Sequence, residues 1–169
     1  MPLKPQELRN ATYHGAFARL SERLADKDYW AVNRIVTPAS IRRMGDIEMM
    51  SDLLIGLMHG PQGGSAKIID EYYEQFEQYD DDLPGQARLS NLFERTLKDI
   101  EAMFPNIAAV PRWGNRADFY SLFQALGSQL STREIKNYKA AARQLYEFAT
   151  MVDQNLRGST ADFDPLVES

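Results

Sequence analysis

The sequence contains no cysteine. Disulfide bridges, thiolate metal sites and cysteine nucleophiles are therefore excluded, and the redox compartment of the protein stays undetermined. Histidine is scarce as well, because His14 and His59 are the only two and neither lies in an HExxH or comparable ligand pattern. For both histidines, a position on the surface or at a helix end is a simpler interpretation than metal ligation.

Long apolar runs are also missing. Residues 1–5 (MPLKP) are not followed by the apolar core of a signal peptide, and no later run approaches the roughly 20 apolar residues that span a bilayer. We therefore expect a cytoplasmic protein with no membrane partner. The net charge of −5 argues against a broad phosphate-binding surface, since non-specific nucleic-acid affinity comes from clustered Lys and Arg. A local basic patch is compatible with this charge.

The apolar residues that are present repeat at helical spacing. Hydrophobic residues make up 44% of the 169 positions, which is enough for one modest core. No segment alternates at period two, so we expect an all-α fold, an irregular bundle of about six to eight helices. Residues 1–158 are expected to form a single helical domain, followed by a mobile polar tail at residues 159–169.

Capping and periodicity give the expected helix positions. The Thr37-Pro38 pair fits the start of a long central helix with apolar positions from Ile41 to Met58, and Asn115 fits a helix cap. A capping-box pattern at residues 131–134 predicts the start of the last helix, which Arg157-Gly158 would end. The remaining expected helices cover residues 6–14, the region around residues 17–24, and residues 68–79 and 89–104.

No pattern in the sequence supports a catalytic, metal or cofactor site in this chain. The acidic stretch at residues 70–82 lacks the alternating ligands and central glycine of a calcium loop, so a solvated face is the simpler interpretation. The glycine-rich residues 60–65 precede a lysine at position 67, but the order required of a phosphate loop is absent. Methionines at 44, 49, 50 and 58 fit an ordinary core better than an adaptable binding groove.

The first expected helix has an unusual polar face. Gln6, Arg9, Asn10 and Tyr13 lie at i, i+3, i+4 and i+7, so four side chains capable of directed hydrogen bonds share one side. Amide and guanidinium groups suit a planar or phosphate-bearing partner, or the surface of an adjoining domain. An ordinary solvated face fits the periodicity equally well.

Three stretches of the sequence resemble one protein family. Residues 2–15 (PLKPQELRNATYHG) are similar to the LNxQELRNAxYxG stretch of the family called domain of unknown function 262. Residues 43–48 (RMGDIE) resemble its RMxDxE stretch, and residues 115–123 (NRADFYSLF) resemble its NKADFYSLF stretch. The three stretches occur in the family's order and span most of the chain.

The resemblance implies a role in restriction or other anti-phage defence. Members of that family carry an N-terminal ParB/sulfiredoxin-like domain, in which an Asp-Gly-Gln-Gln-Arg motif is linked to nucleotide binding and hydrolysis, and many add an HNH nuclease domain. This sequence contains neither motif. We therefore expect it to begin at the join with the ParB-like domain, at residues 1–15, and to keep the helical region that follows. Nucleotide with a divalent cation would belong to the ParB-like domain.

Two functions stay open at this point. In the first, the chain is a non-catalytic segment that couples a ParB-like nucleotide-binding domain, in cis or in trans, to DNA-acting parts of the assembly. Gln6, Arg9, Asn10 and Tyr13 would then contact that domain or its nucleotide. In the second, the chain is a free-standing helical protein-interaction module, with a homo-oligomer left open and no link to nucleotide. Neither function assigns a catalytic residue to this chain.

Overall fold

The computed structural model describes residues 2–62, 65–110, 112–130 and 134–161, with side chains up to residue 155. These residues contain nine α-helices, one 3-10 turn and no strand, which confirms the all-α prediction. Their bounds are α1 (Pro5–Thr12), α2 (Ala16–Ala25), α3 (Tyr29–Val32), α4 (Pro38–Ile41), α5 (Gly45–His59), α6 (Ala66–Gln75), α7 (Gln86–Met103), η1 (Ile107–Ala109), α8 (Arg116–Leu130) and α9 (Tyr138–Ala161).

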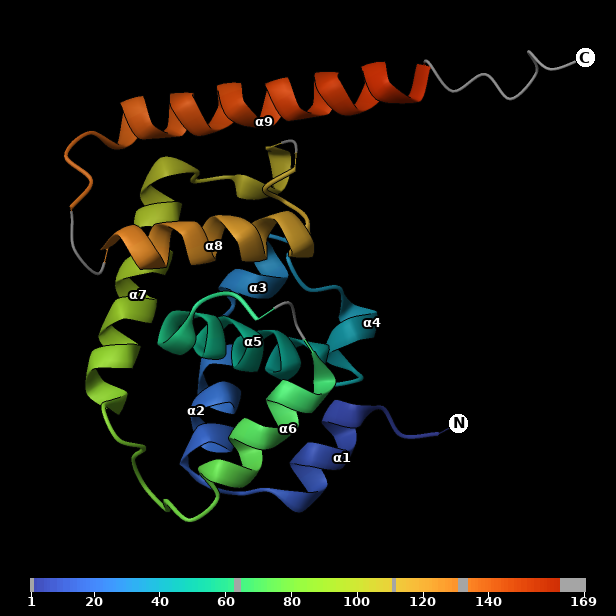
Figure 1. Cartoon of the computed structure of the whole chain (residues 1–169), viewed down its shortest axis with the longest axis vertical. Helices are drawn as coiled ribbons and strands as arrows, with labels where there is room; N and C mark the ends of the chain where they lie inside the picture. The colour runs from blue at the N-terminus through green and yellow to red at the C-terminus, as the bar shows by residue number, and fades with distance from the viewer. Residues whose placement is uncertain (1, 63–64, 111, 131–133, 162–169) are drawn as a thin grey trace, which may run out of the picture.

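Helix α5 occupies the centre of the molecule (Figure 1). It packs against α1, α2, α4, α6, α7 and α8. Eight of its residues are buried, among them Met49, Met50, Leu53 and Leu54, so the methionines at 49 and 50 belong to the core as predicted. None of the described helices combines the length and the apolar character that crossing a membrane requires.

An aromatic cluster closes the core above α5. The Phe93 ring on α7 lies 4.9 Å from Phe123 on α8 and 6.3 Å from Trp30 on α3, measured between ring centroids. The Trp30 ring also lies 5.8 Å from Phe119, and its indole N–H donates to the backbone oxygen of Leu24 at 2.8 Å. This bond satisfies the one polar atom of a ring that is only 1% exposed. Short helix α3 positions Trp30 for these contacts.

The long helix predicted from residue 37 to residue 58 is broken in two. Thr37 caps α4 as predicted, and its hydroxyl accepts a bond from the Ser40 backbone at 3.2 Å. The chain then turns at Met44, whose φ of 56° is left-handed and incompatible with a continuous helix. A side chain on the next residue, Gly45, would overlap the Ser40 hydroxyl. The apolar spacing of residues 41 and 44 was therefore misleading, and Ile41 is 37% exposed.

The last helix starts and ends later than predicted. Asn137 caps α9 by accepting a bond from the Ala140 backbone at 3.0 Å, whereas residues 131–133 of the predicted capping box lie outside the described residues. The backbone stays helical to residue 161, past the predicted stop at 157–158, because a glycine in the last turns weakens a helix without ending it. Residues 162–169 of the predicted tail lie outside the described part of the chain.

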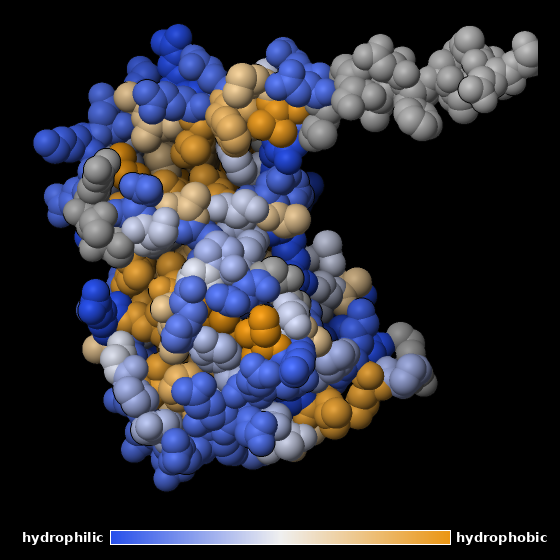
Figure 2. Space-filling view, viewed as in Figure 1, coloured by the Kyte–Doolittle hydropathy of each residue, from blue (hydrophilic) through white to orange (hydrophobic). Residues whose placement is uncertain are grey.

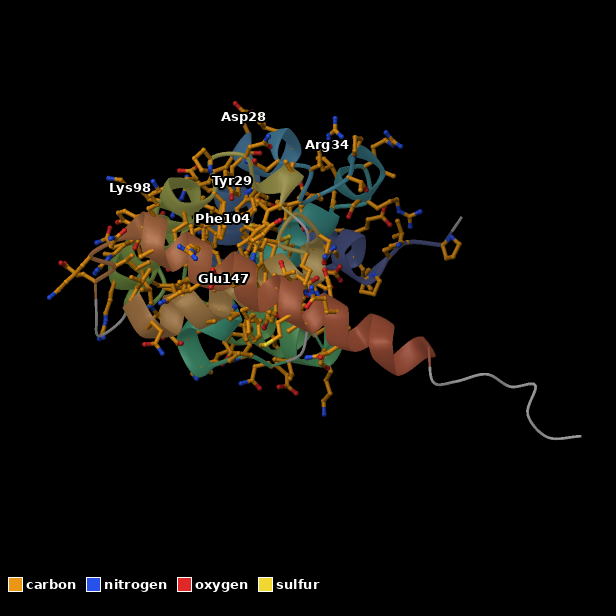
Figure 3. All side chains as sticks on the ribbon, turned by 90° about the horizontal axis from the view of Figure 1, so that it is seen from above. Asp28, Tyr29, Arg34, Lys98, Phe104 and Glu147 are labelled. Carbon is orange, nitrogen blue, oxygen red and sulfur yellow. The ribbon has the colours of Figure 1, made fainter. Side chains whose placement is uncertain are left out.

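Helix α9 lies across one end of the molecule, and its C-terminal part extends beyond the other helices (Figure 3). Arg112 fastens it: Nη1 donates to Asp153 on α9 at 2.7 Å and Nη2 donates to Asp118 on α8 at 2.9 Å. Asn115 caps α8 as predicted, accepting from the Asp118 backbone at 3.0 Å. Arg112 therefore joins the start of α8 to the middle of α9.

We expect Phe93→Ala to lower the free energy of unfolding by about 3–5 kcal/mol, because the ring is fully enclosed and its removal leaves a cavity. Denaturant unfolding measures the change. Phe148→Ala on α9, where the ring is 52% exposed, is the matched control and is expected to cost less than about 1 kcal/mol. Equal losses in the two variants would contradict the assignment of the core.

Candidate functional site

The polar face of α1 is buried rather than exposed. Gln6 and Arg9 are 1% and 2% exposed, whereas Leu8 on another side of the helix is 58% exposed. The prediction that Gln6, Arg9, Asn10 and Tyr13 line an exposed face is therefore wrong for the first two, and the other two are half-buried. Periodicity correctly showed that these polar residues share one face of the helix. It does not show whether a face of amides and one arginine points into the protein or into solvent.

Arg9 is at the centre of the contacts that hold α1. Its guanidinium donates from Nε to Asp70 Oδ1 at 2.6 Å, from Nη2 to the Ala66 backbone oxygen at 2.9 Å, and from Nη1 to Gln6 Oε1 at 3.1 Å. Nη1 also lies 3.7 Å from Glu48 Oε1. A guanidinium removed from water needs its charge and its N–H groups matched. These partners therefore fix α1 against α5 and α6.

A chain of uncharged polar groups continues from Gln6 into the core. Gln6 Nε2 donates to the Tyr73 hydroxyl at 2.8 Å, which shares a 3.0 Å hydrogen bond with the Ser51 hydroxyl. Ser51 in turn contacts the Ser21 hydroxyl at 3.2 Å. Burial raises the pKa of Tyr73, against the lowering effect of these hydrogen bonds, so the phenol stays protonated and able to donate. The network joins α1, α6, α5 and α2.

Asn10 and Tyr13 also have partners within the chain. Asn10 Nδ2 donates to Glu22 Oε1 at 2.8 Å, and the Tyr13 ring lies 5.8 Å from the Tyr73 ring. Both side chains keep part of their surface exposed. Contact of this pair with another protein or domain stays a prediction, while Gln6 and Arg9 are engaged in holding the fold.

The acidic stretch at residues 70–82 is largely exposed, in agreement with its interpretation as a solvated face, and two of its carboxylates also bond to the N-terminal segment. Asp70 accepts from Arg9, and Glu77 Oε2 accepts from the backbone N–H groups of His14 and Gly15 at 3.0 and 2.8 Å. A side chain at position 15 would overlap the backbone of Glu77, so glycine is required there. Helix α6 and the turn after it therefore hold both α1 and the turn that leads to α2.

The three stretches that carry the family resemblance meet in space. Glu48 joins them, because its Oε1 lies 3.7 Å from Arg9 Nη1 and its Oε2 lies 3.5 Å from Arg116 Nη2. Arg43 Nη2 also donates to Glu7 Oε2 at 2.8 Å. The pKa of the Glu7 carboxyl lies below its usual value. The main cause is the hydrogen bond from the Lys4 backbone N–H, and the hydrogen bond and positive charge of Arg43 add to it. Segments far apart in the sequence thus form one charged cluster.

A cavity of about 310 Å³ opens beside this cluster. Three cationic side chains and one carboxylate line it, together with an amide, a hydroxyl and two small residues: Lys4, Arg43, Arg116, Glu48, Gln6, Ser40, Ala39 and Gly45. Helical spacing singled out Gln6, and Arg43 and Arg116 lie within stretches that carry the resemblance, but neither pattern predicted that these residues and Ser40 line one cavity. The placement of Ser40 and Arg43 depends on the turn at residues 42–44, which the apolar pattern concealed, whereas Arg116 is the first residue of α8.

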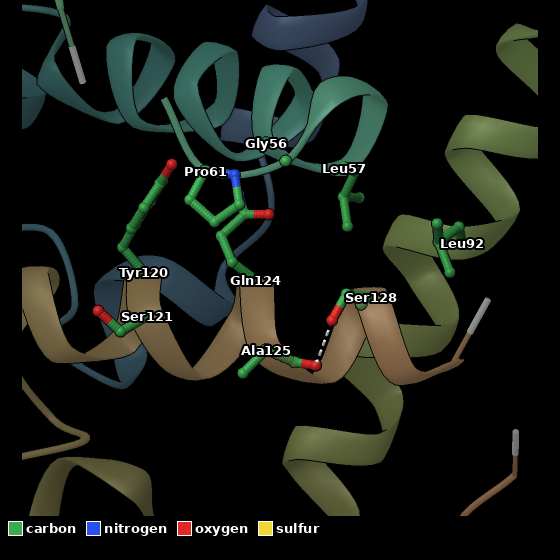
Figure 4. A pocket seen from close by; sticks show the side chains of 11 residues that line it. Gly56, Leu57, Pro61, Leu92, Tyr120, Ser121, Gln124, Ala125 and Ser128 are labelled. Carbon is green, nitrogen blue, oxygen red and sulfur yellow. Dashed lines mark hydrogen bonds between the residues drawn. The ribbon is translucent and has the colours of Figure 1, made fainter. Parts of the chain in front are cut away.

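A second cavity, of about 470 Å³, lies between α5, α7 and α8 (Figure 4). Its polar groups are mainly used within the chain: Gln124 donates to the Leu53 backbone at 3.0 Å, and Ser121 and Ser128 bond to their own helix at 3.2 and 2.9 Å. Gln124 packs directly over Gly56, where a Cβ would overlap it. Closely packed helices surround this cavity, and no charged side chain lines it, in contrast to the cavity beside Glu48.

The charged cavity beside Glu48 is therefore the candidate functional site. Within the described residues, no group of three or more His, Cys, Asp or Glu side chains is arranged to hold a metal ion. Comparison of the chain with protein families, with curated proteins and with solved structures found no match.

We expect Arg9→Ala to destabilise the chain by about 2–4 kcal/mol, because it removes a charge-assisted bond and leaves a void between α1 and α6. Thermal and denaturant unfolding measure the loss. The control is Arg23→Ala on the exposed side of α2, expected to change stability by less than about 0.5 kcal/mol. A similar small effect at Arg9 would contradict the buried network.

Proposed function

We propose that this chain is the helical, non-catalytic segment of a ParB-like, nucleotide-dependent restriction or anti-phage protein, and that it couples the nucleotide-binding domain to DNA-acting parts. The observation that carries the proposal is the meeting of the three family-like stretches around Glu48. Residues that are scattered in the sequence but share one cluster are expected when a common task, here the attachment of a preceding domain, depends on their mutual position.

Coupling requires a connected path of contacts through the molecule, and ion pairs lie along one. The path runs from α1 to α5 through Arg9 and Glu48, and from α5 to α8 through Glu48 and Arg116. It continues from α8 to α9 through Asp118, Arg112 and Asp153. A domain attached ahead of α1 would then be connected to the far end of the bundle through packed helices.

The burial of Gln6 and Arg9 moves the proposed docking surface to the outer side of α1. Leu3 and Leu8 are 68% and 58% exposed there, on a groove of about 530 Å³ that Tyr13 and Asp70 also line. Figure 2 shows apolar atoms at the surface in the region where α1 lies. Two exposed leucines next to a polar rim are typical of a surface that another domain covers.

The docking proposal predicts a large effect of Leu8→Glu on binding of the ParB-like domain supplied in trans. Loss of a buried leucine contact costs about 1.5–3 kcal/mol, so affinity should fall roughly ten- to a hundredfold. Val32→Glu, at a residue that is 74% exposed on α3, is the matched control and should leave affinity unchanged. Calorimetric titration of each variant, with a thermal melt of each, makes the measurement.

Equal affinities of the wild-type chain and the Leu8→Glu variant would remove this surface from the proposal. The genomic neighbourhood gives an independent check, since the proposal requires a reading frame for the Asp-Gly-Gln-Gln-Arg motif in the same or an offset frame upstream. Its absence would contradict the proposed function as a whole.

One observation favours the alternative function, a free-standing interaction module. Tyr146, Phe148 and Met151 on α9 are each about half exposed, at 49%, 52% and 52%. Large apolar side chains on a helix that extends beyond the bundle suit contact with another protein, a second copy included. Self-association of the isolated chain that Phe148→Glu abolishes, together with no binding of a ParB-like domain, would favour the module over the coupling segment.

A further inference from the structure

The cavity beside Glu48 differs in charge from the groove between α3 and α7. Its lining holds Lys4, Arg43 and Arg116 against one carboxylate, Glu48. The groove between α3 and α7 is lined by three cations and three carboxylates and is therefore balanced: Lys27, Arg95, Lys98, Asp28, Glu94 and Glu101. In a chain with a net charge of −5, a cavity with a local excess of cations is a feature that invites an anionic ligand.

The cations of this cavity retain donors that the protein does not use. Among the described residues, the Lys4 ammonium has no ion-pair partner, and Arg43 makes hydrogen bonds through Nη2 alone. Arg116 is 42% exposed and lies 3.5 Å from Glu48, which is long for a charge-assisted bond. An arriving anion can therefore be bound without breaking the short Arg43–Glu7 bond.

The carboxylates nearby are neutralised from the protein side. Glu7 accepts from the Lys4 backbone at 2.6 Å and from Arg43, and Glu48 lies between Arg9 and Arg116. Asp52 interacts electrostatically with Arg116. Burial raises the pKa of the Asp52 carboxyl, Arg116 opposes this rise, and Glu48 adds to it. Repulsion of an anion by these groups is thus reduced, although Glu48 sets a limit to the affinity.

We propose that this cavity binds a phosphate group of a small phosphorylated ligand. Lys4, Arg43 and Arg116 supply the positive charge, and the Ser40 hydroxyl, which makes no hydrogen bond to any described residue, supplies a further donor. The first residue of α5, Gly45, also lines the cavity. A volume of about 310 Å³ suits one or two phosphate groups and is too small to admit a nucleic-acid duplex.

The inference adds a ligand to the proposed function, and its test uses the chain without any upstream domain. Failure to bind phosphate and failure to dock a domain are therefore read separately. The ¹⁵N-labelled chain is titrated with inorganic phosphate, with pyrophosphate and with a metal-free nucleoside triphosphate, each at matched ionic strength. We expect saturable shifts of the amides of Ser40, Gly45 and Arg116 by pyrophosphate, with a Kd on the order of 1 mM.

Charge-matched variants assign the binding to this cavity. Arg116→Gln and Lys4→Gln should each weaken pyrophosphate binding about tenfold, because each removes one charge-assisted contact. Arg143→Gln removes the same charge from α9, where the side chain is 81% exposed, and should leave binding unchanged. Retention of amide dispersion in every variant shows that the fold is intact.

The titrations distinguish a nucleotide from a smaller phosphorylated ligand, and they distinguish both from results that contradict the proposal. A nucleoside triphosphate that binds at least as tightly as pyrophosphate identifies nucleotide as the source, whereas binding of pyrophosphate alone identifies a smaller phosphorylated ligand. Both results support the proposal. The absence of saturable shifts, an equal loss of binding in Arg143→Gln, or shifts caused by a short DNA duplex but not by pyrophosphate would each overturn it.

Discussion

The guanidinium of Arg9 is almost completely removed from water, and the structure of the N-terminal half follows from the acceptors that it needs. Asp70 and the Ala66 carbonyl lie on α6, Glu48 lies on α5, and Gln6 precedes Arg9 by one turn of α1. An apolar face could slide against its neighbours at little cost, but a fork of donors fits its acceptors in one position only. Arg9 therefore sets the register of α1 on the bundle, and its partner Glu48 passes that register on to α8.

This polar attachment also decides which side of α1 is left for other molecules. Because the amide and guanidinium groups of α1 face inward, Leu8 on another side of the helix faces outward, and Leu3, just ahead of the helix, is exposed as well. A short helix with its polar side buried and leucines on its exposed side is costly in water unless something covers those leucines. The same arrangement that stabilises α1 thus leaves apolar side chains exposed near the N-terminal end of the described chain, where we propose that another domain docks.

Helical periodicity predicted the fold class and the positions of α2, α6, α7 and α8, because each of these helices buries one apolar stripe. It failed where a single backbone angle overrides the pattern. Met44 belongs to a regular apolar series, yet its left-handed φ separates α4 from α5, and nothing in the residue type announces that angle. The candidate site depends on this turn, because Arg43 and Gly45 flank it. The burial of Gln6 and Arg9 was equally hidden, since their partners on α5 and α6 are 39 to 67 residues away in the chain.

The residues in and around the three resembling stretches divide into two groups by what surrounds them. Gln6 and Arg9 have their hydrogen-bonding groups occupied by the chain itself, so their chemistry is used to hold α1 in place. Arg116 and Lys4, which border the same cluster, keep exposed or unpaired charge. The buried pair, Gln6 and Arg9, thus holds α1 in place, and this brings the exposed charges of Lys4 and Arg116 to a defined position. The chemistry available to a ligand is then found at the edge of the cluster, where the charges are not fully matched, rather than at the buried arginine in its centre.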